Sequence, residues 1–122
     1  MTKINSFKDL IVWQTSMDLV DVCFDIVEAI ERPYRYVFAD QLLPSGISIP
    51  SNIAEGQGRQ HRKEFLHFIS VANGSLAELD TQRIIAGNLR LIDAETSAHL
   101  DDKITEVRKM LYTLAAKLRE TN

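Results

Sequence analysis

Metal binding is the first chemistry that the sequence suggests, because Glu64 and His67 form a Glu-x-x-His pair. Carboxylate-bridged di-metal bundles use two such pairs, each on its own helix. The chain has no second pair, since His99 follows Glu95 at the wrong spacing. Cys23 has no histidine or cysteine nearby, so we interpret it as a buried core thiol rather than a ligand. The sequence therefore predicts neither a metal nor another cofactor, and His67 is expected at the surface or its boundary.

Nucleophilic catalysis is not indicated either, because the chain lacks a Gly-x-Ser-x-Gly elbow. The Gly56-Gln57-Gly58 stretch resembles half of a phosphate-binding loop, but it follows a helical segment instead of a strand. A helix C-terminus is the better interpretation, with Gly56 or Gly58 in the left-handed conformation. The sequence therefore predicts that the protein is not an enzyme and has no catalytic residues.

A basic corner follows this segment and consists of Arg59, Arg62 and Lys63, with His61 among them. These side chains could contact the phosphates of RNA or another nucleic acid. The alternative, which we favour, is a solvated corner or one that pairs with an acidic face of a neighbouring subunit. The chain carries a net charge of −3, so nucleic-acid binding would need a local basic patch of this kind.

A polar stripe runs along the segment before the corner, at steps of 4, 3, 4, 3 and 4: Gln41, Ser45, Ser48, Asn52, Glu55 and Arg59. Ser48 and Asn52 are short and uncharged, unlike the lysines and glutamates of most solvated helix faces. We expect a buried hydrogen-bond network that joins them to Glu78 of the next segment. A ligand site made of the same groups is the alternative.

The element before Pro33 has more apolar surface than one helix of a bundle needs. Ser6 and Asp9 resemble a capping box at its start. One apolar face of a helix recurs at steps of 3 and 4: Leu10, Trp13, Met17, Val20, Phe24 and Val27. A second apolar set lies beside it: Leu19, Cys23, Ile26 and Ile30. The remaining stripe is acidic: Asp18, Asp21, Asp25 and Glu28. The surplus favours burial against another subunit.

The next segment, about 34–56, keeps its helical period through Pro50, which predicts a kink inside one helix near that residue. Pro44 belongs to "LPSG", which could instead be a turn and start the helix near Ser45. The third segment, about 64–91, has this expected core face: Phe65, Phe68, Ala72, Leu76, Leu79, Ala86 and Leu89. Gly74 and Gly87 interrupt it and are tolerated best where another backbone approaches closely.

The last segment repeats apolar residues at steps of 4 and 3: Leu100, Ile104, Val107, Leu111, Leu114 and Leu118. Four helices with short connections predict an all-α, antiparallel, up-and-down four-helix bundle that forms one domain over residues 1–122. Apolar residues make up 45% and charged residues 25%, as in ordinary soluble proteins. A single cysteine, no signal peptide and no long apolar run predict a cytoplasmic protein without a membrane segment.

Five motifs together resemble the four-helix bundle proteins named after the 23S rRNA intervening sequence. They are "FKDLIVWQ" at 7–14, "QL" at 41–42, "SIPSNIAEG" at 48–56, "KEF" at 63–65 and "GSLAEL" at 74–79. The resemblance implies a left-handed bundle that assembles as a homopentameric ring and has no known enzymatic activity. Members were first noticed as reading frames in bacterial rRNA genes. The resemblance also implies structural or assembly roles for the matching residues: Ser48, Asn52, Ile53, Glu55, Gly56, Ser75 and Glu78.

Two departures from the family pattern stand out. Pro44 and Gly46 replace a basic residue and an alanine, which bears on the straightness of the second helix. His61 replaces a serine that would have completed a capping box with Glu64. A related branch resembles the accessory proteins of diversity-generating retroelements, which bind nucleic acid and a reverse transcriptase. This branch is the alternative function, although the acidic total argues against it.

Overall fold

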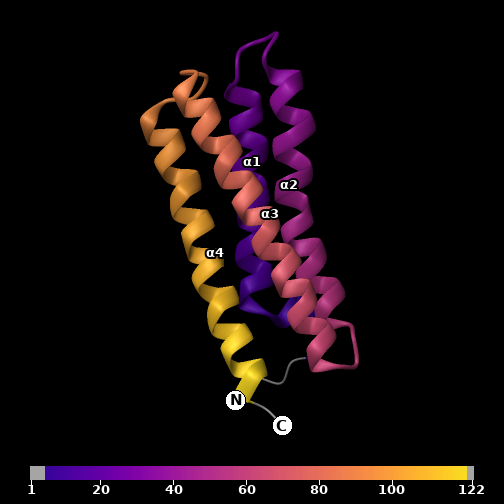
Figure 1. The fold of residues 1–122 in the computed structure, drawn as a ribbon. Coiled ribbons are helices and arrows are strands. Elements are labelled where there is room, and N and C mark those ends of the chain that lie inside the picture. The colour runs from indigo at the N-terminus through magenta and orange to yellow at the C-terminus, as the bar shows by residue number, and fades with distance from the viewer. Residues whose placement is uncertain (1–4, 121–122) are drawn as a thin grey trace.

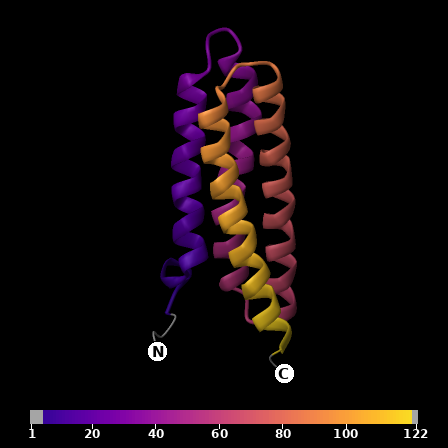
Figure 2. The same cartoon turned by 90° about the vertical axis from the view of Figure 1, so that its left-hand side faces the viewer.

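The chain folds into four long helices that run alternately up and down and lie side by side (Figures 1 and 2). The structure is a computed structural model and describes residues 5–120. The helices are α1 (Ile11–Ala29), α2 (Arg35–Gln57), α3 (Arg62–Asn88) and α4 (Ala94–Glu120), and a short 3-10 helix, η1 (Phe7–Asp9), precedes them. No strand occurs within this range. The predicted all-α four-helix bundle is confirmed, whereas the outermost residues of the predicted domain, 1–4 and 121–122, lie outside the described range.

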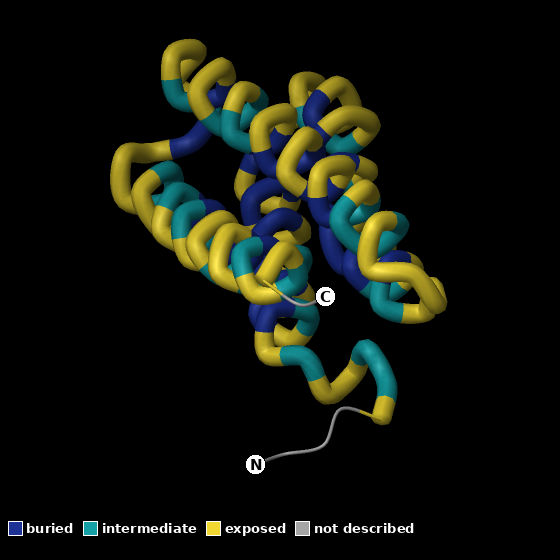
Figure 3. The backbone as a smooth tube through the Cα atoms, turned by 60° about the horizontal axis from the view of Figure 1, so that its bottom comes forward, coloured by how far each residue is buried: buried dark blue, intermediate teal, exposed yellow. Residues whose placement is uncertain are grey.

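Each helix contacts two others in a closed square. α1 contacts α2 and α4, α3 contacts the same two helices, and α1 and α3 are diagonal to each other. The buried backbone lines the inside of the square (Figure 3). All four helices contribute large, fully buried side chains: Leu19, Ile26, Ile30, Leu42, Ile49, Ile53, Leu76, Leu79, Leu100, Ile104, Val107 and Leu111. Within residues 5–120, no helix is apolar over a length sufficient to cross a bilayer.

The structure shows which of the two apolar stripes of α1 points into the core. The second apolar set, Leu19, Cys23, Ile26 and Ile30, is almost fully buried. Of the first stripe only Val27 is buried, while Met17 and Phe24 are 42% and 48% exposed. The sequence left this choice open because the two stripes lie side by side on this helix, and their periodicity is the same. The acidic stripe, Asp18, Asp21, Asp25 and Glu28, is exposed as a whole.

The predicted capping box is present, but it caps η1 rather than α1. The Ser6 hydroxyl accepts a hydrogen bond from the Lys8 amide at 3.1 Å, and the Asp9 carboxylate accepts one from the Ser6 amide at 3.1 Å. α1 begins two residues later, after Leu10. At its other end α1 stops at Ala29, before Pro33, as the sequence predicts.

α2 passes through both of its prolines. Pro44 and Pro50 lie inside one helix that extends from Arg35 to Gln57. The alternative of a turn at "LPSG" is therefore wrong, because the helix begins nine residues before Pro44. A proline inside a helix removes one hydrogen-bond donor but leaves the rest of the ladder in place. The kink expected near Pro50 stays a prediction.

The turn between α3 and α4 explains one wrong core residue. Leu89 was expected in the core but is 61% exposed, because α3 ends at Asn88 and the chain turns. Arg90 takes a positive φ of 60°, and Ile92, just beyond it, is buried instead. Asp93 then caps α4 by accepting a hydrogen bond from the Thr96 amide at 2.7 Å. Hydrogen bonds from the Thr96 side chain and amide lower the pKa of this carboxyl.

α4 matches its predicted pattern best. Four residues of the expected stripe, Leu100, Ile104, Val107 and Leu111, are fully buried, and Leu114 and Leu118 are half-buried against the core. Between these last two, Ala115 is also buried. The match is good because α4 carries a single apolar stripe, so no second face competes for the interior.

Candidate functional site

α2 and α3 approach each other closely at Gly56. A Cβ atom placed there would lie 2.8 Å from Phe68 Cβ and 2.9 Å from Phe65 Cδ1, which is too close for any side chain larger than glycine. Gly46 has the same function between α2 and α1, where a Cβ atom would lie 2.9 Å from Cys23 Sγ. These two glycines therefore permit close packing of helices, and neither is needed for backbone conformation.

Two sequence-based expectations about glycines are wrong. Neither Gly56 nor Gly58 adopts the left-handed conformation; no glycine in the described part of the chain has a positive φ, and Gly58 has a φ of −75°. Gly74 was expected where another backbone approaches, yet no atom lies within 4 Å of the position its Cβ would take. Gly87 has only Ser97 Oγ, at 3.9 Å.

A hydrogen-bond network crosses from α2 to α3 at Ser48. Its hydroxyl lies 2.8 Å from the Ser75 hydroxyl, and the Asn52 amide donates to the Ser48 hydroxyl at 2.9 Å and to the Ser48 carbonyl at 2.7 Å. The expectation that Glu78 is the partner on α3 is wrong, because Glu78 is exposed and Ser75 occupies that place. Ser75 lies three residues, about one turn, before Glu78 on α3 and is buried.

A second bridge between the same helices was missed by the sequence analysis. The Gln82 amide donates to the Ser45 hydroxyl at 3.1 Å, and Ser45 donates to the Gln41 carbonyl at 2.9 Å. Gln82 lies seven residues after Ser75, so the heptad spacing was a signal that could have placed it on the same face. Its Oε1 atom is buried and has no hydrogen-bond partner among the described residues.

The structure divides the basic corner into a paired and an unpaired part. The Arg59 guanidinium contacts the Glu55 carboxylate at 2.6 Å and the Glu64 carboxylate at 3.7 Å, and it lies 4.9 Å from the centre of the Phe68 ring. Arg62 and Lys63 are exposed and make no ion pair within residues 5–120. The charges of Arg62 and Lys63 are therefore available to another molecule, whereas that of Arg59 is already paired with Glu55 and Glu64.

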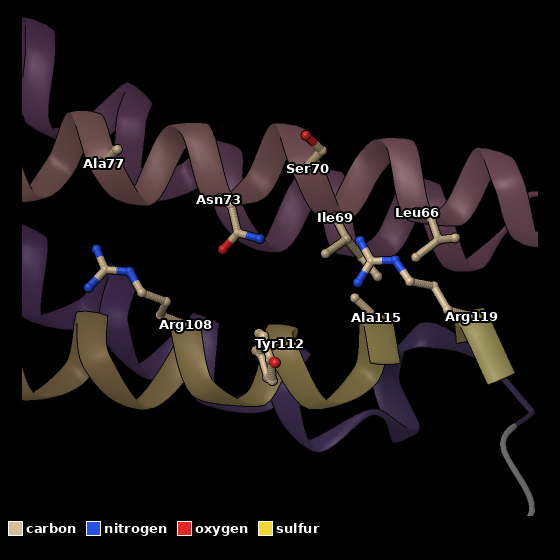
Figure 4. Close-up of a pocket in the computed structure, with 9 residues that line it drawn as sticks. All are labelled: Leu66, Ile69, Ser70, Asn73, Ala77, Arg108, Tyr112, Ala115 and Arg119. Atoms are coloured by element: carbon tan, nitrogen blue, oxygen red, sulfur yellow. The ribbon is translucent and has the colours of Figure 1, made fainter. Parts of the chain in front are cut away.

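A groove of about 420 Å³ lies between α3 and α4 (Figure 4). We call it the α3–α4 groove, and its lining residues are Leu66, Ile69, Ser70, Asn73, Ala77, Arg108, Tyr112, Ala115 and Arg119. Figure 4 shows α3 contributing mostly short side chains and α4 contributing the two arginines and the tyrosine. No lining residue is acidic. The sequence carries no local signal for this groove, because its residues come from two segments about 40 positions apart.

Groups that could support metal or thiol chemistry are not assembled. Among the residues that the structure describes, no three histidine, cysteine, aspartate or glutamate side chains could hold one metal ion. Cys23 is fully buried, and this burial raises the pKa of its thiol to about 12. The thiolate is the nucleophilic form, so Cys23 is unreactive near neutral pH. His67 is exposed, and its ring packs edge-on to Phe68 with the ring centres 5.4 Å apart.

Comparison with known proteins extends over most of the chain. The family model described as "23S rRNA-intervening sequence protein" matches residues 8–113. A crystal structure of a protein of unknown function from the S23 ribosomal protein family, from Bacteroides thetaiotaomicron, superposes with a TM-score of 0.80. The alignment covers 86% of this chain and 98% of that one at 22% identity, so it supports the fold alone. No curated protein matches the chain.

Proposed function

The chain belongs to the 23S rRNA-intervening sequence protein family, and from this premise we propose that it is a non-enzymatic bundle that assembles into a ring-like homo-oligomer, with a pentamer as the expected size. It acts in the bacterial cytoplasm in this proposal. The observation that carries the proposal is that large apolar side chains of α1 are exposed in the single chain. Absence of a catalytic constellation in the sequence agrees with a structural role.

The outward side of α1 exposes large apolar side chains beside its acidic stripe. Met17 and Phe24 are 42% and 48% exposed, and they lie seven residues apart, on one face of the helix. Ile11, which is 68% exposed, lies instead beside α4 and lines a groove with residues of that helix. Large exposed apolar patches mark interaction sites in soluble proteins. Because the exposed apolar side chains from Met17 to Phe24 extend over about two turns of α1, this surface fits a helix of another subunit.

A second exposed apolar surface lies on α3, which is diagonal to α1. Val71 and Ile85 are exposed there, and Ile47 is exposed on the neighbouring α2. A two-fold dimer buries the same patch on both subunits, whereas contact between two different patches is head-to-tail and gives a ring when the rotation closes. Two apolar surfaces on opposite sides of the square therefore favour a ring over a simple dimer.

The assembly is tested by light scattering after gel filtration, where we expect a mass near five chains. Phe24→Ser should weaken the subunit contact by about tenfold to a hundredfold, since burial of a phenylalanine contributes about 1.5–3 kcal/mol. Tyr112→Ser, which also removes an exposed aromatic residue but from α4, is the control and should leave the mass unchanged. A strict monomer of the unaltered protein at micromolar concentration would contradict the proposal.

Nucleic-acid binding is a second candidate function, in the manner of a retroelement accessory protein. It is supported by Arg62 and Lys63, which lack ion pairs within residues 5–120 and project from the corner of each subunit. Repetition around a ring would multiply a weak single contact, because linked sites bind the same strand together. Arg59 contributes less than the sequence suggested, since Glu55 and Glu64 already pair with it.

A further inference from the structure

The C-terminal half of α4 concentrates positive charge in a chain that is acidic overall. Residues 108–120 contain four basic residues and one acidic residue, whereas residues 11–29 contain four acidic residues and no basic one. Two of these basic residues, Arg108 and Arg119, line the α3–α4 groove and are exposed. This stretch of α4 supplies the local basic patch that nucleic-acid binding requires in a protein of negative net charge.

The two groove arginines, Arg108 and Arg119, are unpaired within the described residues 5–120. Neither Arg108 nor Arg119 makes an ion pair or a hydrogen bond in the part of the chain that the structure describes. Arg83, farther along the same interface between α3 and α4, contacts Asp80 at 2.9 Å and Asp101 at 3.7 Å. Acidic residues therefore neutralise the arginine at one end of this interface and leave the groove positively charged.

An aromatic ring lies between the two arginines. Arg108, Tyr112 and Arg119 are spaced by four and seven residues, which places them on one face of α4, and Figure 4 shows Tyr112 between the two guanidinium groups. The Tyr112 side chain is 74% exposed, so its ring is accessible to a ligand. Aromatic side chains that alternate with positive charge are the usual way to hold single-stranded nucleic acid, since every base can stack on a ring.

The opposite wall of the groove, formed by α3, leaves room for a ligand and carries no negative charge that would repel phosphates. Ser70, Asn73 and Ala77 of α3 are short and uncharged, and all three are exposed. An amide side chain such as that of Asn73 can both donate to and accept from the edge of a base. Half of this groove is thus suited to phosphates and the other half to bases.

The spacing of the arginines favours an extended ligand. Eleven residues separate Arg108 from Arg119, which is about 16 Å along a helix axis. An extended strand can therefore contact the two arginines with successive phosphates. Arg62 lies one turn before Leu66 on the same face of α3, so the unpaired part of the basic corner continues the line of positive charge.

From these observations we propose that the α3–α4 groove binds a single strand of RNA or DNA, with Arg108 and Arg119 contacting phosphates and Tyr112 stacking on a base. The proposal deepens the second candidate function and rests on it, but it does not depend on the ring. An acidic peptide could also pair with the two arginines. Its carboxylates, however, would neither stack on the exposed ring of Tyr112 nor require the amide of Asn73, which can hydrogen-bond to base edges.

Fluorescence anisotropy with labelled 12-nucleotide RNA and DNA strands of mixed sequence tests the proposal on the full-length protein. We expect salt-sensitive binding that weakens at least tenfold in the Arg108→Ala, Arg119→Ala double variant. Loss of two phosphate contacts should reduce the slope of log K against log salt by about 1.4. Tyr112→Ala should weaken binding by about tenfold without changing that slope, because stacking releases no counterions.

Lys109→Ala is the matched control for Arg108→Ala. It removes one positive charge from the adjacent position of α4, but Lys109 is outside the lining of the groove. Equal losses from Lys109→Ala and Arg108→Ala would mean that only the general field of α4 attracts the strand, and they would overturn the proposal. Light scattering of each variant should give the mass of the unaltered protein, which separates loss of binding from loss of assembly.

Two further results would overturn the proposal. One is no binding of either strand at 100 μM protein and low salt. The other is displacement of the labelled RNA by poly-glutamate as effectively as by unlabelled RNA, together with no effect of Tyr112→Ala. This pair of results would identify an acidic peptide as the ligand. A monomeric protein that still binds RNA through the groove would end the ring proposal and leave this one intact.

Discussion

α3 presents short side chains on two of its sides, but it packs closely against α2 on one side and leaves an open groove beside α4 on the other. Toward α2 it places Ser75 against Ser48 and the Phe68 Cβ and the ring of Phe65 against Gly56, and the two helices pack closely. Toward α4 it presents Ser70, Asn73 and Ala77, and a groove of about 420 Å³ remains.

The difference lies in the facing helix. α2 offers a glycine and short hydroxyl side chains, so the backbones approach and hydrogen bonds bridge the gap. α4 offers Arg108, Tyr112 and Arg119, whose polar ends remain in solvent and leave the space beside α3 unfilled. Small residues on one helix therefore permit either close packing or an open groove, and the partner decides which forms.

Of the substitutions that test this comparison, Gly56→Ala should have the largest effect on the free energy of unfolding. The added Cβ would lie within 3 Å of both Phe65 and Phe68, so α2 and α3 must move apart. Overpacking of this kind lowers the free energy of unfolding by about 1–3 kcal/mol. Urea denaturation at a fixed protein concentration measures the change. An unchanged midpoint would show that the seam between α2 and α3 can relax at little cost.

Ser75→Ala should have a smaller effect on the same side of α3. It removes the hydroxyl that lies 2.8 Å from Ser48, and a hydrogen bond of this type contributes about 0.5–1.5 kcal/mol to stability. Ser70→Ala, on the groove side of the same helix, is the matched control and should stay within about 0.5 kcal/mol of the unaltered protein. Equal effects of the two substitutions in thermal unfolding would contradict the distinction between the two sides.

Gly74→Ala should have the smallest effect and the opposite sign. No atom lies within 4 Å of the position its Cβ would take, so the substitution removes the cost of a glycine inside a helix, up to about 1 kcal/mol. The midpoint of urea denaturation should rise slightly. A fall instead would indicate that a second subunit approaches α3 at Gly74, and light scattering of the variant would then show weaker assembly.

The sequence predicted most of the architecture because helical periodicity and prolines are local signals. The end of α1 before Pro33 and the core stripe of α4 were predicted correctly, and continuity of α2 through Pro50 followed from its unbroken period. Leu89 was misplaced because a helix end is decided by the turn after it, where Arg90 has a positive φ. The buried face of α1 could not be chosen from the sequence, because two apolar stripes satisfied the same rule.

The candidate sites were predicted less well than the fold. Ser48, Asn52 and Ser75 were recognised by type and by family motif, but Ser75 replaced Glu78 as the partner across the seam. Arg59 was counted as an available charge, although it pairs with Glu55 and Glu64. The α3–α4 groove was not predicted, since its lining comes from two segments about 40 positions apart.

By itself the sequence determined that four amphipathic helices form, where prolines end or interrupt them, and which family the chain resembles, because each of these depends on residues within a few turns of one another. Only the tertiary structure decided which stripe of α1 is buried, which glycines lie against a neighbour, and which arginines remain unpaired. Those properties depend on what the facing helix presents, and the distance between facing residues along the chain carries no information about their distance in space.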